Sequence, residues 1–214
     1  MRVELVRKGA AGADAQLICL VAAPEEPLER LPELESSLVV VMVDDWDGDL
    51  TPWPAPAAYS GQQPYKGHAR KTLDELLHNA LPQAEREAGL APKSRAIAGY
   101  SLAGLFSLWT FANSDAFTAC ASGSGSFWYP GWLDWLSEQH FIGHGRHAYL
   151  SLGSKESRVR HPLVAEVANA TERTIGLLEA RGVECVFESN PGGHFTDISG
   201  RLAKALCALD GWRA

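Results

Sequence analysis

The sequence predicts an α/β fold in which a mostly parallel central sheet is covered by helices on both faces. Segments with strand character alternate with segments with helix character, and this alternation is typical of parallel sheets. Residues 16–22 form a nearly continuous apolar run, as a strand covered on both faces requires. No repeat and no shift in composition divides the 214 residues, so we expect one domain over residues 1–214.

Composition and charge argue against several classes of protein. The chain is 46% hydrophobic and 21% charged, as in ordinary globular proteins. Its net charge is −7 and it has no long Lys/Arg cluster, so we expect no nucleic-acid partner. The longest apolar run, residues 38–43, is far shorter than the ~20 residues of a membrane helix. Residues 1–5 do not read as a secretory signal, so we expect no membrane partner and a cytoplasmic location.

The four cysteines do not pair in the sequence as a C-x-x-C motif. They are Cys19, Cys120, Cys185 and Cys207. Since most of them lie in apolar segments with strand character, we expect buried free thiols in a reducing compartment rather than disulfides.

The first half of the chain is expected to supply four strands and two helices. Apolar and β-branched segments predict strands at 2–7, 16–22, 38–43 and 93–98. Residues 24–35, rich in Glu and Leu, predict a short helix, and residues 68–87 predict a longer one. Pro82 should kink or split that longer helix. Residues 44–66 are expected to form a long proline-rich loop, and loops of this length are usually functional or mobile.

The second half continues the alternation. Strands are expected at 117–121, 147–152 and 184–188. Helices are expected at 102–112, 132–138, 162–180 and 197–209. Pro162 suits the first position of its helix and Gly182 suits the stop, because proline needs no donor there and glycine adopts the left-handed conformation that ends helices.

A strand-to-helix junction carries the strongest functional signal. Residues 98–105 read Ala-Gly-Tyr-Ser-Leu-Ala-Gly-Leu, so that a strand ends, Ser101 follows and a helix begins at once. This is the layout of a nucleophile elbow, a turn so tight that the residues around the serine must be small. Small residues stand there: Gly99, Ala103 and Gly104. The serine would project at the carboxyl edge of the sheet, although it could also be only a helix N-cap.

A serine nucleophile needs a base, and the chain offers one in the right order. On such a scaffold the acid and then the histidine follow the serine. His194 lies between the last expected strand and the last helix, and Glu156 follows the preceding strand. Asp197 is the alternative acid, unless it only favours the first turn of its helix. Asp44 and Asp45 also end a strand, but they precede the serine.

These motifs resemble those of the α/β-hydrolase fold, and within it the putative esterase family that includes esterase D and the enterochelin (ferric-siderophore) esterases. The resemblance extends over nearly the whole chain from Gln16 onward. The segments that carry it are the elbow, the strand end, the histidine loop and a proline-rich stretch: 99–106, 151–156, 193–195 and 49–56. The resemblance implies that Ser101 is the nucleophile, His194 the base and Glu156 the acid.

The N-terminal part is short for this fold, and two features near the site also depart from the family pattern. Ala103 replaces the usual glycine two positions after the serine, and it is small enough to fit. Residues 22–24, Ala-Ala-Pro, replace the His-Gly or Asp-Gly often found after the oxyanion strand. We therefore expect an oxyanion hole made by the backbone N–H of Leu102 and by that of Ala22 or Ala23.

The reaction expected from this constellation is the hydrolysis of carboxylic esters through an acyl-enzyme, with no cofactor. Two other functions remain open. An acyltransferase would use the same three residues and exclude water from the acyl-enzyme. A non-catalytic binding module could share the scaffold, because fold does not dictate function.

Tryptophans are expected to line the substrate site. Trp46 and Trp53 lie in the proline-rich loop and Trp128 follows a run of Ser and Gly, and both loops should reach the edge of the sheet near the serine. An aromatic wall would suit a small-molecule ester with an aryl or acyl group. The alternative is that these rings pack a small cap or the interface of a homo-oligomer.

A metal site is not expected. His140, His144 and His147 have a spacing that could line one face of a helix. Gly143 and Gly145 interrupt that helix, so a solvent-exposed loop is the better interpretation. The sequence also contains no phosphate-binding glycine loop and no dinucleotide fingerprint.

Overall fold

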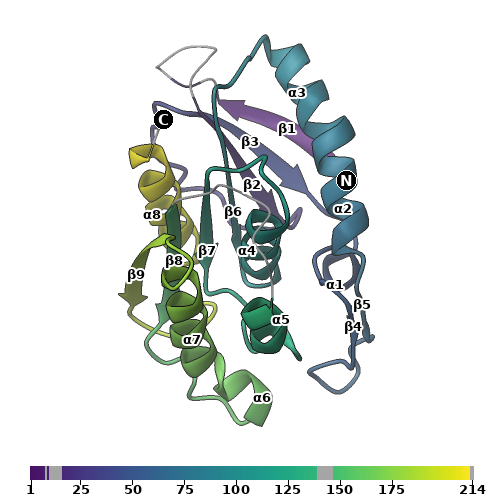
Figure 1. Ribbon diagram of the computed structural model, residues 1–214, viewed down its shortest axis with the longest axis vertical. Helices are drawn as coiled ribbons and strands as arrows, with labels where there is room; N and C mark the ends of the chain where they lie inside the picture. Colours follow the sequence, from purple (N-terminus) through teal and green to yellow (C-terminus); the bar gives the residue numbers. More distant parts are fainter. Residues whose placement is uncertain (8, 10–15, 139–146, 213–214) are drawn as a thin grey trace.

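A mixed sheet forms the centre of the computed structural model, which describes residues 1–7, 9, 16–138 and 147–212. Within these residues the strand order is β1-β3-β2-β6-β7-β8-β9 (Figure 1). The strands are β1 (Arg2–Arg7), β2 (Leu17–Ala22), β3 (Ser37–Met42), β6 (Arg95–Tyr100), β7 (Ala119–Gly123), β8 (His147–Gly153) and β9 (Glu184–Asn190). Strand β1 is antiparallel to β3, and the other neighbouring pairs are parallel. The mostly parallel sheet is therefore confirmed.

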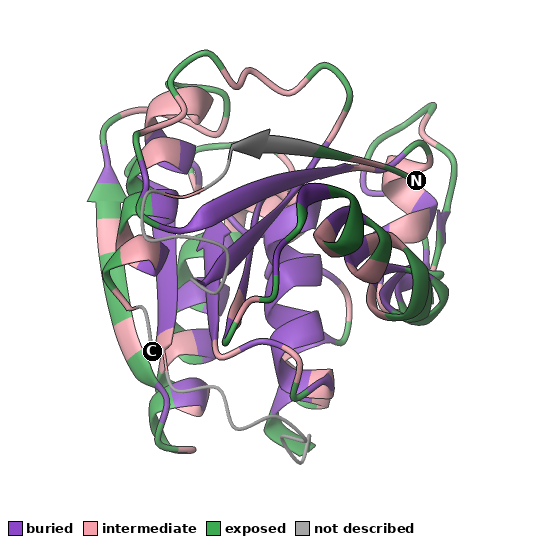
Figure 2. Ribbon diagram, turned by 90° about the horizontal axis from the view of Figure 1, so that it is seen from above, coloured by how far each residue is buried: buried purple, intermediate pink, exposed green. Residues whose placement is uncertain are grey.

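Helices cover both faces of this sheet, as the sequence predicts, and the buried strands lie between them (Figure 2). The helices are α2 (Ala69–Glu75), α3 (Leu81–Ala88), α4 (Leu102–Asn113), α5 (Trp132–Glu138), α6 (Pro162–Ala165), α7 (Val167–Glu179) and α8 (Ile198–Gly211). Alternate residues of β2 face opposite ways: Cys19 packs with α4, whereas Leu20 packs with α8. Because both faces of β2 are buried, the strand is apolar throughout.

Pro82 interrupts the long helix expected over residues 68–87. A π-helical turn, Leu76–Ala80, separates α2 from α3, and Pro82 lies in the first turn of α3. The Leu81 N–H donates to the Leu76 carbonyl, five residues back. Proline has no N–H to donate to the preceding turn and its ring crowds that turn, so the widened turn accommodates it.

The helix expected over residues 24–35 was a wrong prediction, since this segment consists of turns and irregular structure. Pro27 and Pro32 stand five residues apart, and each removes a donor and disfavours the helical conformation in the residue before it. Too few residues remain between them for a stable helix. Leucines of the segment still pack against the core on the α8 side: Leu28, Leu31 and Leu34.

Other local expectations need smaller corrections. The loop expected over residues 44–66 contains helix α1 (Trp46–Asp49) and a two-stranded ribbon of β4 (Pro54–Ala55) and β5 (Tyr65–Lys66). The helix expected over residues 162–180 is divided into α6 and α7. No helix in the described ranges has both the length and the apolar character to cross a bilayer.

The four cysteines are free, as expected, but they are not all buried. Cys19 and Cys120 are buried in central strands, Cys185 is half-buried on β9, and Cys207 is exposed on α8. Burial raises the pKa of Cys19 to about 12, so this thiol is unreactive. The difference arises because β9 is an edge strand and Cys207 lies on the outer side of a surface helix.

The carboxyl ends of the parallel strands meet at one edge of the sheet. Tyr100 at the end of β6 pairs in register with Gly123 at the end of β7. Gly153 at the end of β8 pairs with Asn190 at the end of β9. The loops that follow these strands, which carry the residues singled out from the sequence, therefore start side by side.

Candidate active site

Ser101 occupies the tight turn between β6 and α4. Its backbone lies in the left-handed region, with φ 59° and ψ −121°, which is unfavourable for a residue with a side chain. Its N–H donates to the Gly123 carbonyl at 2.9 Å, and its own carbonyl accepts from the Ser126 N–H at 3.1 Å. A Cβ on Gly99 would lie 2.4 Å from backbone atoms of Ala103. The turn is thus a nucleophile elbow that only small neighbours permit.

The imidazole of His194 joins Ser101 to Glu156. His194 Nε2 lies 2.9 Å from Ser101 Oγ, and Nδ1 lies 2.8 Å from Glu156 Oε2. A carboxylate only accepts hydrogen bonds, so Nδ1 carries the proton and Nε2 is left with a lone pair toward the serine hydroxyl. The three side chains therefore have the relative geometry of a nucleophile, a base and an orienting acid.

Glu156 is held as a buried carboxylate. It is 4% exposed, and its Oε1 accepts from the Gly153 N–H at 2.6 Å and from the Ser124 hydroxyl at 2.7 Å. Burial acts to raise its pKa, but the hydrogen bonds from His194 and Ser124 and the charge of the imidazole outweigh burial and lower the pKa. Glu156 is thus ionised at neutral pH and can stabilise a protonated His194.

The other candidate acids have different partners. Asp197 Oδ1 lies 2.8 Å from Arg30 Nη1, and the Asp197 side chain is 56% exposed. Asp44 pairs with the amino terminus at 3.2 Å, and Asp45 pairs with Lys66 at 2.6 Å. Among the candidates weighed from the sequence, the structure brings Glu156 to His194.

Leu102 is the expected oxyanion donor that the structure brings to the site. It is the first residue of α4 and lines the cavity beside Ser101, so that the positive end of the helix dipole faces this space. Neither Ala22 nor Ala23 lines the cavity. Ala22 is buried at the end of β2, and its carbonyl accepts from the Val43 N–H.

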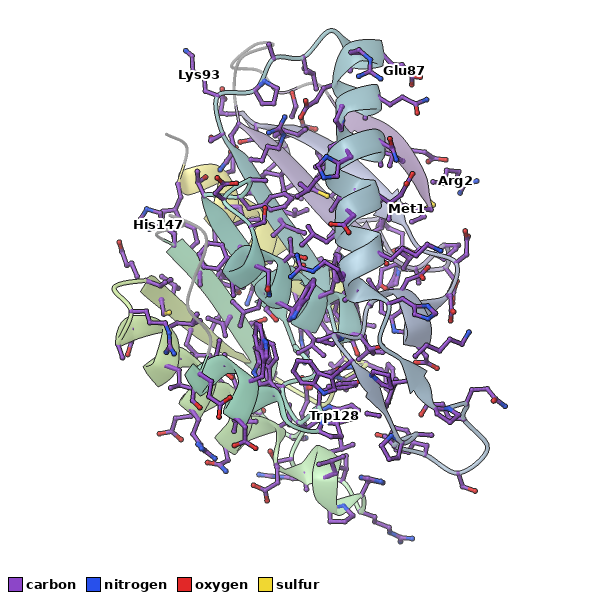
Figure 3. All side chains as sticks on the ribbon, turned by 45° about the vertical axis from the view of Figure 1, so that its right-hand side comes forward. Met1, Arg2, Glu87, Lys93, Trp128 and His147 are labelled. Carbon is purple, nitrogen blue, oxygen red and sulfur yellow. The ribbon has the colours of Figure 1, made fainter. Side chains whose placement is uncertain are left out.

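A cavity of about 400 Å³ opens onto Ser101 and His194. Trp46 and Trp128 line it, as expected, together with Tyr59 and Phe195. In Figure 3, Trp128 lies toward the end of the molecule opposite Lys93, which precedes β6, so the cavity is at the carboxyl edge of the sheet. A concave, mostly apolar site with a few polar groups is typical of small-molecule binding.

Trp53 does not line this cavity, contrary to the expectation from the sequence. Its indole N–H donates to the Pro130 carbonyl at 2.8 Å, and its ring lies 5.9 Å from that of Tyr129 and 5.8 Å from that of Trp135. Trp53 therefore packs the proline-rich loop against the segment after β7. This is the packing role that the sequence left open as the alternative.

The histidine group considered as a metal site can be described only in part. His140 and His144 lie outside the described residues. The ring of His147 stacks on Trp212 at 5.0 Å, at the start of β8 and therefore away from the carboxyl edge.

Sequence reasoning missed four polar side chains beside the site. They are Tyr100, Ser124, Ser126 and Arg201. Ser126 Oγ lies 3.5 Å from Ser101 Oγ, and the run Ser-Gly-Ser-Gly-Ser after β7 could have indicated it. Arg201 gives no such signal, because an arginine in a surface helix is ordinarily exposed, whereas this one is 1% exposed.

One protein family and several solved structures are similar to this chain. Residues 30–203 match the model of the family described as Putative esterase. No curated protein matches the chain. An IroE-like serine hydrolase from Shewanella oneidensis has a similar structure, with TM-score 0.76 and 14% identity over 98% of this chain and 74% of that chain.

Two further solved structures are similar. The siderophore hydrolase EstA from Aspergillus nidulans has TM-score 0.68 and 19% identity, over 98% of this chain and 88% of that chain. The enterobactin and salmochelin hydrolase IroE has TM-score 0.69 and 22% identity, over 96% of this chain and 85% of that chain. At these identities the likeness shows that the chain has the same α/β-hydrolase fold.

Proposed function

The chain belongs to the putative esterase family and is a carboxylic ester hydrolase, and from this premise we propose that Ser101, His194 and Glu156 are its catalytic triad. One observation carries the proposal. The hydroxyl, imidazole and carboxylate form a continuous hydrogen-bonded series of 2.9 Å and 2.8 Å, and the series ends in a cavity. A base within such a distance of a serine is the requirement for nucleophilic catalysis.

In the proposed first half-reaction, Ser101 Oγ attacks the ester carbonyl carbon while His194 Nε2 takes the hydroxyl proton. The carbonyl oxygen becomes an oxyanion, which the Leu102 N–H stabilises. Glu156 balances the positive charge on the imidazolium. The bond from carbon to the leaving oxygen then breaks, and His194 returns its proton to that oxygen, so that an alcohol departs and an acyl-enzyme remains.

In the second half-reaction a water molecule replaces the alcohol. His194 removes a proton from the water as its oxygen attacks the acyl carbon. The tetrahedral intermediate collapses, the bond to Ser101 Oγ breaks, and the proton on the imidazolium returns to the serine. The products are a carboxylic acid and the free enzyme, and no cofactor takes part.

The cavity supports an ester with an aryl or other bulky apolar group. Aromatic rings form much of its wall, and several large apolar side chains are exposed where they line it: Tyr59, Val159 and Phe195. Exposed apolar side chains gathered at one site indicate a binding surface. Because similar structures are those of siderophore hydrolases, siderophore esters belong beside simple aryl esters in a substrate panel.

Covalent labelling tests the proposed nucleophile. A fluorophosphonate probe should label the wild-type protein, and Ser101→Ala should abolish both labelling and ester hydrolysis. Ser107→Ala is the matched control, because Ser107 is a buried serine of the same α4 helix whose hydroxyl is bonded to the Ala103 carbonyl, away from the cavity. Ser107→Ala should still be labelled by the probe and should still hydrolyse esters.

Two outcomes would contradict the proposal: a wild-type protein that resists the probe, and a Ser101→Ala protein that is still labelled. Adding an alcohol to the assay separates hydrolysis from acyl transfer. If the ester of the added alcohol outweighs the free acid as product, the enzyme is an acyltransferase.

A further inference from the structure

Arg201 holds together the segments that carry the proposed triad. It lies in α8 and is 1% exposed. Its Nη1 donates to Glu156 Oε1 at 3.0 Å, to Ser124 Oγ at 3.1 Å and to the Tyr100 hydroxyl at 2.9 Å. These partners follow or end three different strands, β6, β7 and β8, so one nitrogen contacts three of the segments that form the site.

The same guanidinium also contacts the histidine loop. Its Nη2 donates to the carbonyls of Pro191 and Gly193, each at 2.9 Å. These residues lie immediately before His194 and flank Gly192, whose φ of 93° is in the left-handed region. Two hydrogen bonds to the residues before a catalytic side chain fix the direction in which the loop presents that side chain.

Two hydroxyl groups connect Arg201 to the proposed base and to the proposed acid. Tyr100 accepts from Arg201 and donates to the His194 carbonyl at 2.6 Å, and Ser124 accepts from Arg201 and donates to Glu156 Oε1 at 2.7 Å. A donor that is itself hydrogen-bonded to a cation is polarised, and hydrogen bonds in such a network strengthen one another. Arg201 therefore contacts Glu156 both directly and through the Ser124 hydroxyl. It contacts the loop before His194 directly, and it reaches His194 itself through the Tyr100 hydroxyl.

We propose that Arg201 is a positioning residue of the hydrolase, which aligns Glu156 and His194 with each other without contacting the substrate. This inference rests on the proposed triad. Arg201 does not line the cavity, so it cannot act on the substrate directly. The fork shape of the guanidinium matters, because one nitrogen binds the acid side and the other binds the histidine loop. An ammonium group has a single nitrogen and cannot replace both.

The surroundings leave little freedom for another arrangement. A Cβ on Gly153 would lie 2.7 Å from Glu156 Oε1 and 2.9 Å from Arg201 Nη2. The Lys155 N–H also donates to the Gly192 carbonyl at 2.9 Å, which ties the acid loop to the histidine loop. Removing the guanidinium would thus leave a buried carboxylate with less support, and the histidine loop would lose the two hydrogen bonds that Arg201 donates to it.

The experiment compares Arg201→Met and Arg201→Lys with wild type. The concentration of active sites is titrated with the fluorophosphonate, and kcat is expressed per titrated site. We expect kcat of Arg201→Met to fall by about 100-fold, because small misplacements of a catalytic group cost rates of this order, while KM changes little. Arg201→Lys should recover only part of the loss, because it restores the charge but not the fork.

Arg95→Met is the matched control. Arg95 is likewise paired with a glutamate, through hydrogen bonds of 2.6 Å and 2.8 Å to Glu85, but it lies at the amino end of β6. Its loss should lower the melting temperature and leave kcat per titrated site unchanged. The comparison separates loss of a half-buried ion pair, at Arg95, from loss of positioning, at Arg201.

A purely structural Arg201 would give fewer titratable sites with normal kcat, and this result would overturn the proposal. Recovery of full kcat in Arg201→Lys would overturn the argument from the shape of the guanidinium.

If Arg201→Met does not fold, Tyr100→Phe provides the test, since it removes the hydroxyl that connects Arg201 to the His194 carbonyl. It should lower kcat by about 2- to 10-fold with KM unchanged, and an unchanged kcat would contradict the inference. Failure of the proposed triad is distinguishable, because wild type itself would then not be titrated.

Discussion

Glu156 combines two demands that a single side chain rarely meets. It is buried, so the cost of its charge has to be offset by hydrogen bonds, and it must also remain able to stabilise a cation on His194. The contacts from Arg201, Ser124 and the Gly153 N–H all go to Oε1, which leaves Oε2 for the imidazole. One oxygen thus anchors the carboxylate and the other orients the base.

This division predicts different outcomes for two carboxylates. Glu156→Gln should lower kcat by about 10³- to 10⁴-fold, because the amide cannot hold the tautomer with a proton on Nδ1 or balance the imidazolium. Asp197→Asn should leave kcat within about twofold, because Asp197 pairs with the exposed Arg30 and not with His194. Steady-state kinetics on an aryl ester measure both. A large loss in Asp197→Asn alone would reverse the assignment of the acid.

At the scale of elements, the β6–Ser101–α4 turn is the feature that places the nucleophile. Its backbone is strained, and the turn is held in this conformation by the pairing of β6 with β2 and β7 and by the packing of α4 on the sheet. Gly99 permits the turn because a side chain there would overlap Ala103. The requirement for glycine at position 99 is steric, so the addition of a single methyl group tests it.

Gly99→Ala should destabilise the fold by about 1–3 kcal/mol through overpacking and should also lower kcat, since the serine is displaced. Gly176→Ala is the control. Gly176 lies in α7, and a Cβ there has no neighbour within 4 Å, so it should stabilise the fold by about 0.5–1 kcal/mol with kcat unchanged. Urea unfolding and kinetics provide the readouts. If Gly99→Ala had the stability and activity of wild type, the turn would accommodate a methyl group without strain, and the requirement for glycine would be contradicted.

The elements also show which parts of the molecule the sequence could predict. The parallel strands, the elbow and the loop of His194 depend on local patterns, namely apolar runs and small residues around one serine. The helix expected over residues 24–35 failed because its leucines have helical spacing but its prolines break the backbone. Trp53 and Arg201 depend on how distant loops pack, which no short pattern records.

At the scale of the whole molecule, the parallel sheet explains why side chains 93 positions apart in the sequence meet. Ser101, Glu156 and His194 follow β6, β8 and β9, whose carboxyl ends lie along one edge. Helix α8 then packs on the face of the sheet opposite to α4, and it places Arg201 next to Glu156 at this edge. Strand direction gathers the reacting groups, and one long-range helix contact fixes their alignment.

The same arrangement links catalysis to acid stability. The pKa of Glu156 in the folded state is lower than its ordinary value: burial alone would raise it, and the hydrogen bonds from His194 and Ser124 outweigh that effect. Its ionised form therefore contributes stability above the ordinary glutamate pKa of about 4.3, and this contribution is lost as the pH falls through the lower folded-state pKa. Protonation also leaves the buried Arg201 guanidinium with less compensation.

Melting temperatures of wild type and Glu156→Gln between pH 7 and pH 3 test this linkage. Wild type should be the more stable protein at pH 7, and the difference should shrink below about pH 4.3, since glutamine has no proton to gain. Other carboxylates with lowered pKa, such as Glu188 hydrogen-bonded to Lys204, titrate in both proteins and cancel in the difference. Parallel curves over the whole range would show that the ionisation of Glu156 does not contribute to stability, and the carboxylate would then matter only for catalysis.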